Sequence, residues 1–321
     1  MLIKIIFIFF VLASIIIFFT RKLAHTGKEF SELTGFSGGL IGFTLLAMIT
    51  SMPEVAMSVS SVLVVNDPNL CGGNLFGSNF FNLTIVAFVE LFVSKGHFLS
   101  MLKPSTRKLI VLQILFALIP IVFIGLGKDY VFYHISLCSV IIIIVYYFFT
   151  RFFDFDDEDD NSSEKITSTL PQVIFRFVLY SSIIVIASIY ITSICDDISE
   201  ITGMGNSFIG ALFLATVSSL PEITLSVSLI QINAYTMAIG NVLGSNFFNI
   251  LIFPITDMFM KESLYVNLFK FHIILFGFTA FSSMMLIIVI GKSKRFALAV
   301  SGCLVASYFL GMYTLFICTG R

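Results

Sequence analysis

Apolar stretches long enough to cross a lipid bilayer recur along the whole chain, with short polar segments between them. About 20 consecutive apolar residues span a membrane as a helix. On this criterion ten transmembrane helices are predicted, at residues 1–20, 35–65, 72–94, 107–127, 131–150, 172–194, 203–230, 235–259, 268–290 and 296–318. Residues 21–32 are predicted to form a polar connector and residues 66–69 a turn. The pattern indicates an all-α polytopic membrane protein.

The longest polar segment divides the predicted helices into two sets of five. Residues 152–171 contain the acidic run Asp154 to Asp160 and end at Pro171. Such a run is typical of a solvated linker, because like charges repel one another. An odd number of helices in the first half, residues 1–151, requires the second half, residues 172–321, to enter the membrane in the opposite orientation. The expected architecture is therefore two inverted five-helix repeats.

Composition supports a membrane protein and excludes several other classes. Hydrophobic residues make up 58% of the chain and charged residues 12%, and the mean hydropathy is +1.03. A net charge of −1 provides no basic surface for nucleic acid, so the lipid bilayer is the expected partner, and nothing indicates a protein partner. The five cysteines show no C-x-x-C spacing, so neither a zinc site nor a redox motif is predicted. We expect no cofactor and no enzymatic activity.

Positive charges predict the orientation in the membrane. Lys and Arg are in excess in cytoplasmic loops. If the N-terminus lies outside, 13 of the 18 Lys and Arg residues fall on the cytoplasmic side. We therefore predict an external or luminal N-terminus and a cytosolic linker at residues 152–171. No signal in the sequence selects one cellular membrane.

One polar motif occurs twice, at equivalent places in the two halves. Residues 42–82 contain TSMPE followed by GNLFGSNFFN, and residues 210–249 contain SSLPE followed by GNVLGSNFFN. Proline removes a backbone donor, so each helix should bend or unwind just before Pro53 and Pro221 and free its carbonyl groups. A charged residue in the middle of a membrane helix costs about 2.5–3.5 kcal/mol. Glu54 and Glu222, at matching positions, therefore indicate a functional site.

The duplicated motif supplies a set of hard oxygen ligands. They are two carboxylates, six hydroxyls and two amides: Glu54, Glu222, Thr50, Ser51, Ser78, Ser218, Ser219, Ser245, Asn82 and Asn249. Ca²⁺ takes 6–8 oxygen ligands and fits this set, whereas soft metals do not. Any single hydroxyl is equally consistent with close helix packing. Glu90 and Asp257 lie near the ends of predicted helices, where we expect them to be solvated.

The twin motifs resemble the two alpha repeats of the calcium/cation antiporter superfamily, most closely its sodium/calcium exchanger branch. This resemblance implies that Glu54 and Glu222 bind transported Ca²⁺ with the backbone around Thr50 and Ser218. It also implies that Ser51, Ser78, Ser219, Ser245, Asn82 and Asn249 complete the Na⁺ sites, and that the first and sixth helices slide across the other eight. Many exchangers carry Asp at one of the two positions that are Asn82 and Asn249 here, so this chain has one carboxylate fewer.

The ion chemistry leaves other functions open. Two carboxylates balance one Ca²⁺, two monovalent cations or two protons, and competition for the same charge is what an antiporter requires. A proton-coupled Ca²⁺ exchanger of the same fold is the main alternative. A passive cation channel is a further one, but paired acidic residues at a repeat interface favour alternating access. A membrane protein without transport activity is the third.

Overall fold

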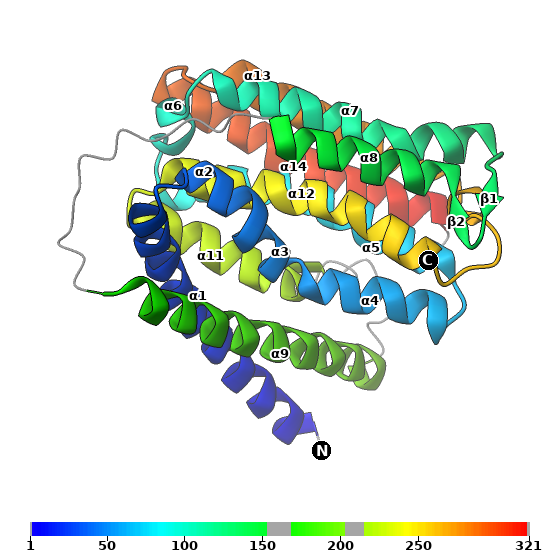
Figure 1. The fold of residues 1–321 in the computed structure, drawn as a ribbon, viewed down its shortest axis with the longest axis horizontal. Helices are drawn as coiled ribbons and strands as arrows, with labels where there is room; N and C mark the ends of the chain where they lie inside the picture. The colour runs from blue at the N-terminus through cyan, green and yellow to red at the C-terminus, as the bar shows by residue number, and fades with distance from the viewer. Residues whose placement is uncertain (1, 153–167, 203–214, 320–321) are drawn as a thin grey trace.

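The computed structural model describes residues 2–152, 168–202 and 215–319, and helices dominate it (Figure 1). Seven of the described helices are long and apolar enough to cross a membrane, or eight when one bent pair is counted as a single span. The seven are α1 (Leu2–Thr34), α5 (Pro68–Phe88), α7 (Ser105–Leu126), α9 (Leu170–Thr202), α12 (Tyr235–Asp257), α13 (His272–Val289) and α14 (Lys294–Thr319). A polytopic helical membrane protein is confirmed. The count of ten stays a prediction, because residues 203–214 lie outside the described part.

The bent pair is the span that contains Pro53. It consists of α2 (Gly38–Ile41), the π-helix η1 (Gly42–Leu46), α3 (Ala47–Thr50) and α4 (Met52–Leu63), and its two parts meet at 45°. The equivalent of α4 in the second half is α11 (Leu220–Gln231). The predicted interruption before Pro53 is therefore confirmed.

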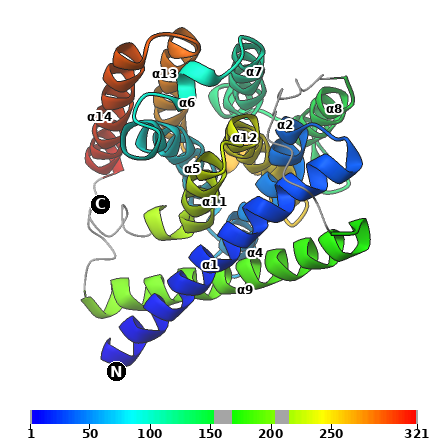
Figure 2. The same cartoon turned by 90° about the vertical axis from the view of Figure 1, so that its left-hand side faces the viewer.

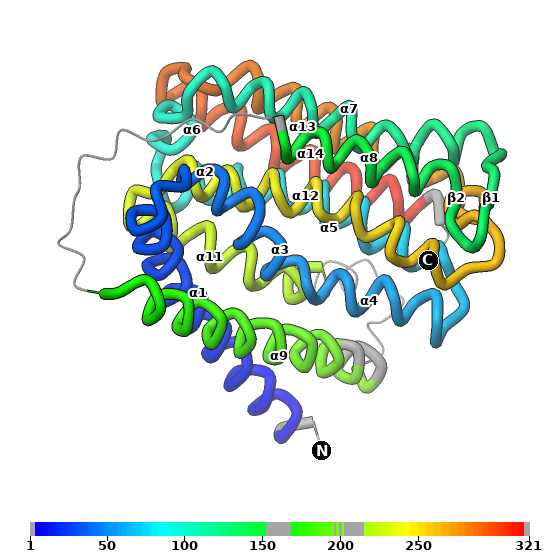
Figure 3. The backbone as a smooth tube through the Cα atoms, viewed as in Figure 1, coloured from blue at the N-terminus to red at the C-terminus, as the bar shows by residue number. Residues whose placement is uncertain are grey.

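The helices are arranged around two central ones (Figures 1 and 2). In the most apolar stretch of each helix, 83% of the residues are buried in α12 and 67% in α5, but only 11% in α1. Helices α1 and α9 pack against each other along one side, and α7, α13, α14 and α8 (Leu137–Phe152) lie on the other side. The chain path in Figure 3 shows that α5 and α12, which carry the duplicated GSNFFN segments, run through the middle.

Central helix α12 comes unusually close to the first half of the chain. A Cβ atom at Gly240 would lie 2.6 Å from the carbonyl oxygen of Gly39, which is closer than real Cβ atoms come. Glycine is needed here because it lets two helix backbones touch, as is common between membrane helices. This contact joins α12 to α2.

The predicted connector at residues 21–32 is wrong, because α1 continues through it to Thr34. A helix of 33 residues is about 50 Å long, whereas the hydrocarbon core is about 30 Å thick. The length of α1 therefore leaves room for its polar end outside the hydrocarbon core. Glu29 in this end forms an ion pair with Arg176 of α9, with an oxygen–nitrogen distance of 2.6 Å. Packing of α1 against α9 keeps residues 21–32 helical, and the prediction of a connector did not take this packing into account.

Two further boundaries differ from the predictions. Residues 131–136 form a hairpin of β1 (Val131–Phe132) and β2 (Ile135–Ser136), and the helix predicted from 131 begins only at Leu137. An apolar run alone does not separate strand from helix. Helix α5 begins at Pro68, four residues earlier than predicted, because the Asp67 side chain caps the Asn69 amide at 2.9 Å.

Glu90 and Asp257 are buried, which contradicts their predicted solvation. Their side chains are 0% and 2% exposed. Glu90 lies in the π-helix η2 (Val89–Val93), just before α6 (Phe98–Met101). Asp257 accepts hydrogen bonds from the Ser136 amide at 2.9 Å and from the Ser139 hydroxyl at 2.7 Å. It also accepts one from the Leu264 amide at 2.9 Å, just before the 3₁₀-helix η3 (Tyr265–Asn267). Hydrogen-bond donors of the protein take the place of water around both carboxylates, so their position near a helix end does not make them exposed.

Candidate cation site at the paired glutamates

Two short helices begin at equivalent places and place one glutamate each. α4 starts after Ser51 and α11 starts after Ser219, each with a proline in its first two positions and a glutamate in its first turn. In Figure 1 the two helices run from the middle of the molecule toward opposite sides. A helix N-terminus carries partial positive charge, which favours a carboxylate or another anion there. Both Glu54 and Glu222 receive this support.

The two carboxylates are buried and close enough to interact electrostatically. Glu54 and Glu222 are each 1% exposed, and the Oε2 atom of each has no hydrogen-bond partner. Within the described ranges neither pairs with a basic side chain. A buried carboxylate without a partner is costly. The pair therefore needs a cation or protons.

Hydroxyl groups from both repeats approach the glutamates. The Ser78 hydroxyl donates to Glu54 Oε1 at 3.5 Å, and the Thr50 hydroxyl lies near the Glu222 carboxylate. Thr50 Oγ1 also lies 3.3 Å from Ser245 Oγ, although the two residues are 195 positions apart in the chain. The structure thus brings together five of the ten predicted site residues: Glu54, Glu222, Thr50, Ser78 and Ser245.

The serines at the helix breaks are buried beside this cluster. Ser51, Ser218 and Ser219 are 1%, 4% and 1% exposed. The Ser218 hydroxyl donates to the Ala215 carbonyl at 3.1 Å, as the Thr50 hydroxyl does to the Ala47 carbonyl at 3.3 Å. Ser51 Oγ has no partner. The two repeats therefore share the same local arrangement at the break.

The two predicted amide ligands are held by two asparagines that the sequence analysis missed. Asn82 donates to Asn246 Oδ1 at 2.9 Å, and Asn249 donates to Asn79 Oδ1 at 3.0 Å. The side-chain oxygens of Asn82 and Asn249 (Oδ1) have no hydrogen-bond partner. Asn79 and Asn246 occupy the same place in the duplicated GSNFFN segment, so the duplication itself could have revealed them. Neither residue is among the ten predicted ligands.

A third asparagine pair behaves differently in the two halves. Asn74 donates to the Glu54 carbonyl oxygen at 3.2 Å and to Ser58 Oγ at 2.9 Å. The equivalent residues, Asn241 and Ser226, are buried, and their side-chain polar atoms have no partners. The site is therefore symmetric in composition and asymmetric in hydrogen bonding.

These donors suit hard cations. Within the described ranges, no three His, Cys, Asp or Glu side chains come close enough to form a metal site. The cluster instead offers two carboxylates and several neutral oxygens, a set that suits Ca²⁺ or Na⁺ better than zinc or copper.

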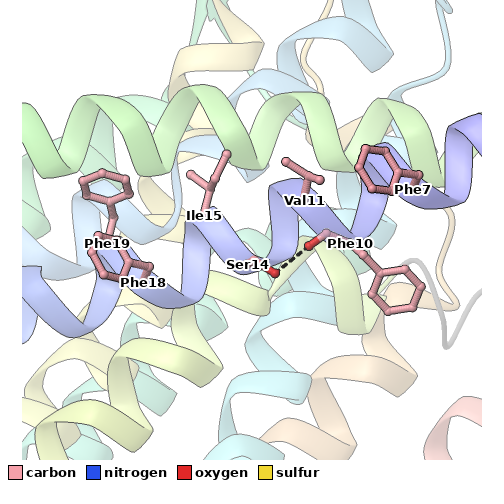
Figure 4. A pocket seen from close by; sticks show the side chains of 7 residues that line it. All are labelled: Phe7, Phe10, Val11, Ser14, Ile15, Phe18 and Phe19. Atoms are coloured by element: carbon pink, nitrogen blue, oxygen red, sulfur yellow. Dashed lines mark hydrogen bonds between the residues drawn. The ribbon is translucent and has the colours of Figure 1, made fainter.

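A concave region elsewhere on the molecule is not part of this cluster. It is lined by residues of α1, including Phe7, Phe10 and Phe18, which are 67%, 62% and 53% exposed (Figure 4). Ser14 is the one polar residue among those that line it, and its hydroxyl donates a hydrogen bond to the Phe10 carbonyl at 2.7 Å. An apolar surface of this kind suits lipid chains.

Comparisons with solved structures support the fold. The structure of the exchanger NCX_Mj soaked with 2.5 mM Na⁺ and 0.1 mM Sr²⁺ superposes with a TM-score of 0.74 at 18% identity, covering 98% of this chain and 99% of that one. The form soaked with 10 mM Na⁺ and no Ca²⁺ gives a TM-score of 0.70 at 19% identity. At such identities the likeness establishes the fold.

Curated relatives match over shorter stretches. A putative antiporter, CaxA of Alkalimonas amylolytica, is 36% identical over 77 residues, which is 24% of each chain. The sodium/calcium exchanger MaX1 of Methanosarcina acetivorans is 32% identical over 102 residues, which is 32% of this chain and 29% of MaX1. The matched stretches thus span less than a third of either relative.

The family model described as sodium/calcium exchanger protein matches residues 4–155 and 172–318, leaving out most of the predicted linker. The match covers both copies of the duplicated motif and all described helices that carry the site. The chain belongs to the sodium/calcium exchanger protein family.

Proposed function

We propose that the protein is a secondary active antiporter that exchanges Ca²⁺ for Na⁺ at the paired-glutamate site. The observation that carries this proposal is the burial of Glu54 and Glu222 within electrostatic range of each other, each with a carboxylate oxygen that has no hydrogen-bond partner. A site with two negative charges and, among the described residues, no basic partner is balanced by one Ca²⁺ or by two Na⁺. Membership of the family supports the same ion pair.

In this proposal the oxygen ligands divide between the two ions. Ca²⁺ lies between Glu54 and Glu222, with Thr50 and Ser218 at the helix breaks as neighbours. Sodium ions use the remaining neutral groups together with the same carboxylates: Ser51, Ser78, Ser219, Ser245, Asn82 and Asn249. Because both ion types need the glutamates, they cannot occupy the site together.

The architecture proposed for transport is the inverted repeat of ten helices. Residues 1–151 form the first repeat, 152–171 the cytosolic linker and 172–321 the second repeat, with the N-terminus outside or luminal. The opposite directions of α4 and α11 support the inversion (Figure 1). Helices α1 and α9, which pack together at one side of the bundle, are the moving pair in this proposal.

Burial of the site supports alternating access over a passive channel. Glu54 and Glu222 are 1% exposed, so both carboxylates are enclosed by protein in the arrangement described here. An open channel needs a continuous polar path, whereas an antiporter passes through a closed state in each cycle. No cofactor or chemical conversion of a substrate enters this scheme.

Uptake of radioactive Ca²⁺ into proteoliposomes tests the proposal. Three conditions are compared: an outward Na⁺ gradient, an outward H⁺ gradient, and no gradient. Uptake above that of protein-free vesicles only with the Na⁺ gradient is expected. Uptake driven by H⁺ alone would replace Na⁺ as the coupling ion, and equal uptake in all three conditions would establish a passive channel.

A further inference from the structure

Four buried asparagines connect the two central helices. Asn79 and Asn82 lie on α5, and Asn246 and Asn249 lie on α12; all four are at most 2% exposed. The second asparagine of each GSNFFN segment donates a hydrogen bond to the first asparagine of the other segment: Asn82 to Asn246 and Asn249 to Asn79. This four-asparagine network joins the two copies of GSNFFN.

A backbone carbonyl fixes the orientation of half of this network. Asn246 Nδ2 lies 3.3 Å from the backbone carbonyl oxygen of Asn79, which can only accept a hydrogen bond. The amide nitrogen of Asn246 must therefore point to that carbonyl, and its oxygen points to Asn82. Asn82 must in turn present its nitrogen to Asn246. Its own oxygen is left without a partner.

Asn82 and Asn249 lie on the helix faces that carry Ser78 and Ser245. Asn82 follows Ser78 by four residues on α5, and Asn249 follows Ser245 by four residues on α12, so each pair shares a helix face. Ser78 contacts Glu54, and Ser245 lies beside Thr50. The unpartnered amide oxygens thus belong to the same polar face as the candidate cation ligands.

We propose that Asn79 and Asn246 are positioning residues that hold the amides of Asn82 and Asn249 with their carbonyl oxygens available to a monovalent cation. This inference rests on the proposed exchange of Na⁺ for Ca²⁺ and assigns a role to two residues outside the ligand set. Neutral oxygens held in place suit Na⁺, which carries a single charge. Ca²⁺ depends mainly on the two carboxylates.

The two halves of the four-asparagine network differ in whether they can accommodate a carboxylate. Among the described residues, Asn79 makes no bond to the backbone of Asn246 that would mirror the anchoring of Asn246, so no backbone carbonyl fixes which side-chain atom Asn79 presents to Asn249. A carboxylate at position 249 can therefore receive the Asn79 NH₂ group. A carboxylate at position 82 faces the fixed oxygen of Asn246, so the acid form, whose hydroxyl can donate, is favoured there.

The first test is Asn246→Leu, which removes the hydrogen bond that Asn82 donates to Asn246 while keeping a side chain of similar size. The concentrations of Na⁺ and Ca²⁺ for half-maximal exchange are measured in proteoliposomes. We expect the Na⁺ value to rise about five-fold, the effect of one net hydrogen bond, and the Ca²⁺ value to change less than about two-fold. Gln113→Leu is the matched control, because it removes an amide that is 2% exposed on α7.

Unchanged Na⁺ dependence in Asn246→Leu would overturn the positioning role, as would an equal shift of the Na⁺ and Ca²⁺ values. Loss of Na⁺-driven uptake in the unmodified protein would instead refute the proposed function. A second comparison applies if Asn246→Leu does not fold. Asn249→Asp should alter Na⁺ dependence at neutral pH, and Asn82→Asp only at alkaline pH. Identical pH profiles for the two aspartate variants would overturn the inference.

Discussion

Ser51 and Ser219 adopt almost the same backbone conformation, with φ/ψ of −88°/9° and −90°/16°, although they lie in different halves of the chain. Each residue ends one helical segment and precedes another of 12 residues. The proline two positions later has no N–H group, so it requires no hydrogen bond from the preceding turn. The interruption that places Glu54 and Glu222 is therefore built independently into each repeat.

Helix α1 is connected to α11 close to one of the glutamates. The Thr20 hydroxyl, which is buried, lies 2.9 Å from the Thr224 hydroxyl, two residues after Glu222. If α1 slides during transport, this bond must break. Thr20→Val should therefore raise the maximal rate of exchange by up to about five-fold, the value of one net hydrogen bond, without changing half-maximal Ca²⁺.

Thr26→Val is the matched control for this prediction. Thr26 is also buried on α1, but its hydroxyl bonds to the Lys22 carbonyl of its own helix. Stopped-flow Ca²⁺ flux on both variants checks the expectation. Equal rates in the two variants would show that the contact between α1 and α11 does not limit movement.

The predicted orientation in the membrane can be tested at Ser163, which lies outside the described residues. A single cysteine introduced there, in a background without reactive cysteines, should react with an impermeant thiol reagent from the cytosolic side only. Labelling of sealed cells from the outside would reverse the proposed topology. The 13 positive charges assigned to the cytoplasmic side are the basis of this prediction.

Asn249→Asp should change the sodium dependence of exchange. The substitution adds a third carboxylate to a site that has two, so more positive charge is needed to balance it. We expect the exchange rate against Na⁺ concentration to show a different half-maximal value or steepness from that of the unmodified protein. Curves that coincide at two pH values would remove Asn249 from the set of groups that contact transported ions.

Protons should compete with both ions. Glu54 and Glu222 have no basic partner among the described residues, so a proton is the simplest substitute for a missing cation. Ca²⁺ uptake at a fixed, subsaturating Ca²⁺ concentration should fall as the pH drops through mildly acidic values. Raising Ca²⁺ should restore it, because the competition is for the same oxygens. Inhibition that high Ca²⁺ does not relieve would place the proton elsewhere.

The sequence allowed much of the site to be predicted because its signals are local and duplicated. Pro53 and Pro221 indicated the breaks, and Glu54 and Glu222 are conspicuous within apolar runs. The hydrogen bonds of Asn79 and Asn246 cross between the repeats and have no local signature. The burial of Asp257 likewise depends on donors from the hairpin at residues 131–136, far away in the chain. The extension of α1 depends on its packing against α9.

The claim at the centre of this account is that Glu54 and Glu222 both bind the exchanged ions. Glu54→Gln and Glu222→Gln each remove one charge while keeping the shape of the side chain. Glu262→Gln makes the same change at an exposed position and serves as the control. Radioactive Ca²⁺ uptake driven by an outward Na⁺ gradient is measured for all three, after folding is checked by thermal unfolding. The account predicts loss of uptake in both buried variants and normal uptake in Glu262→Gln. Near-normal uptake in either Glu54→Gln or Glu222→Gln would contradict it.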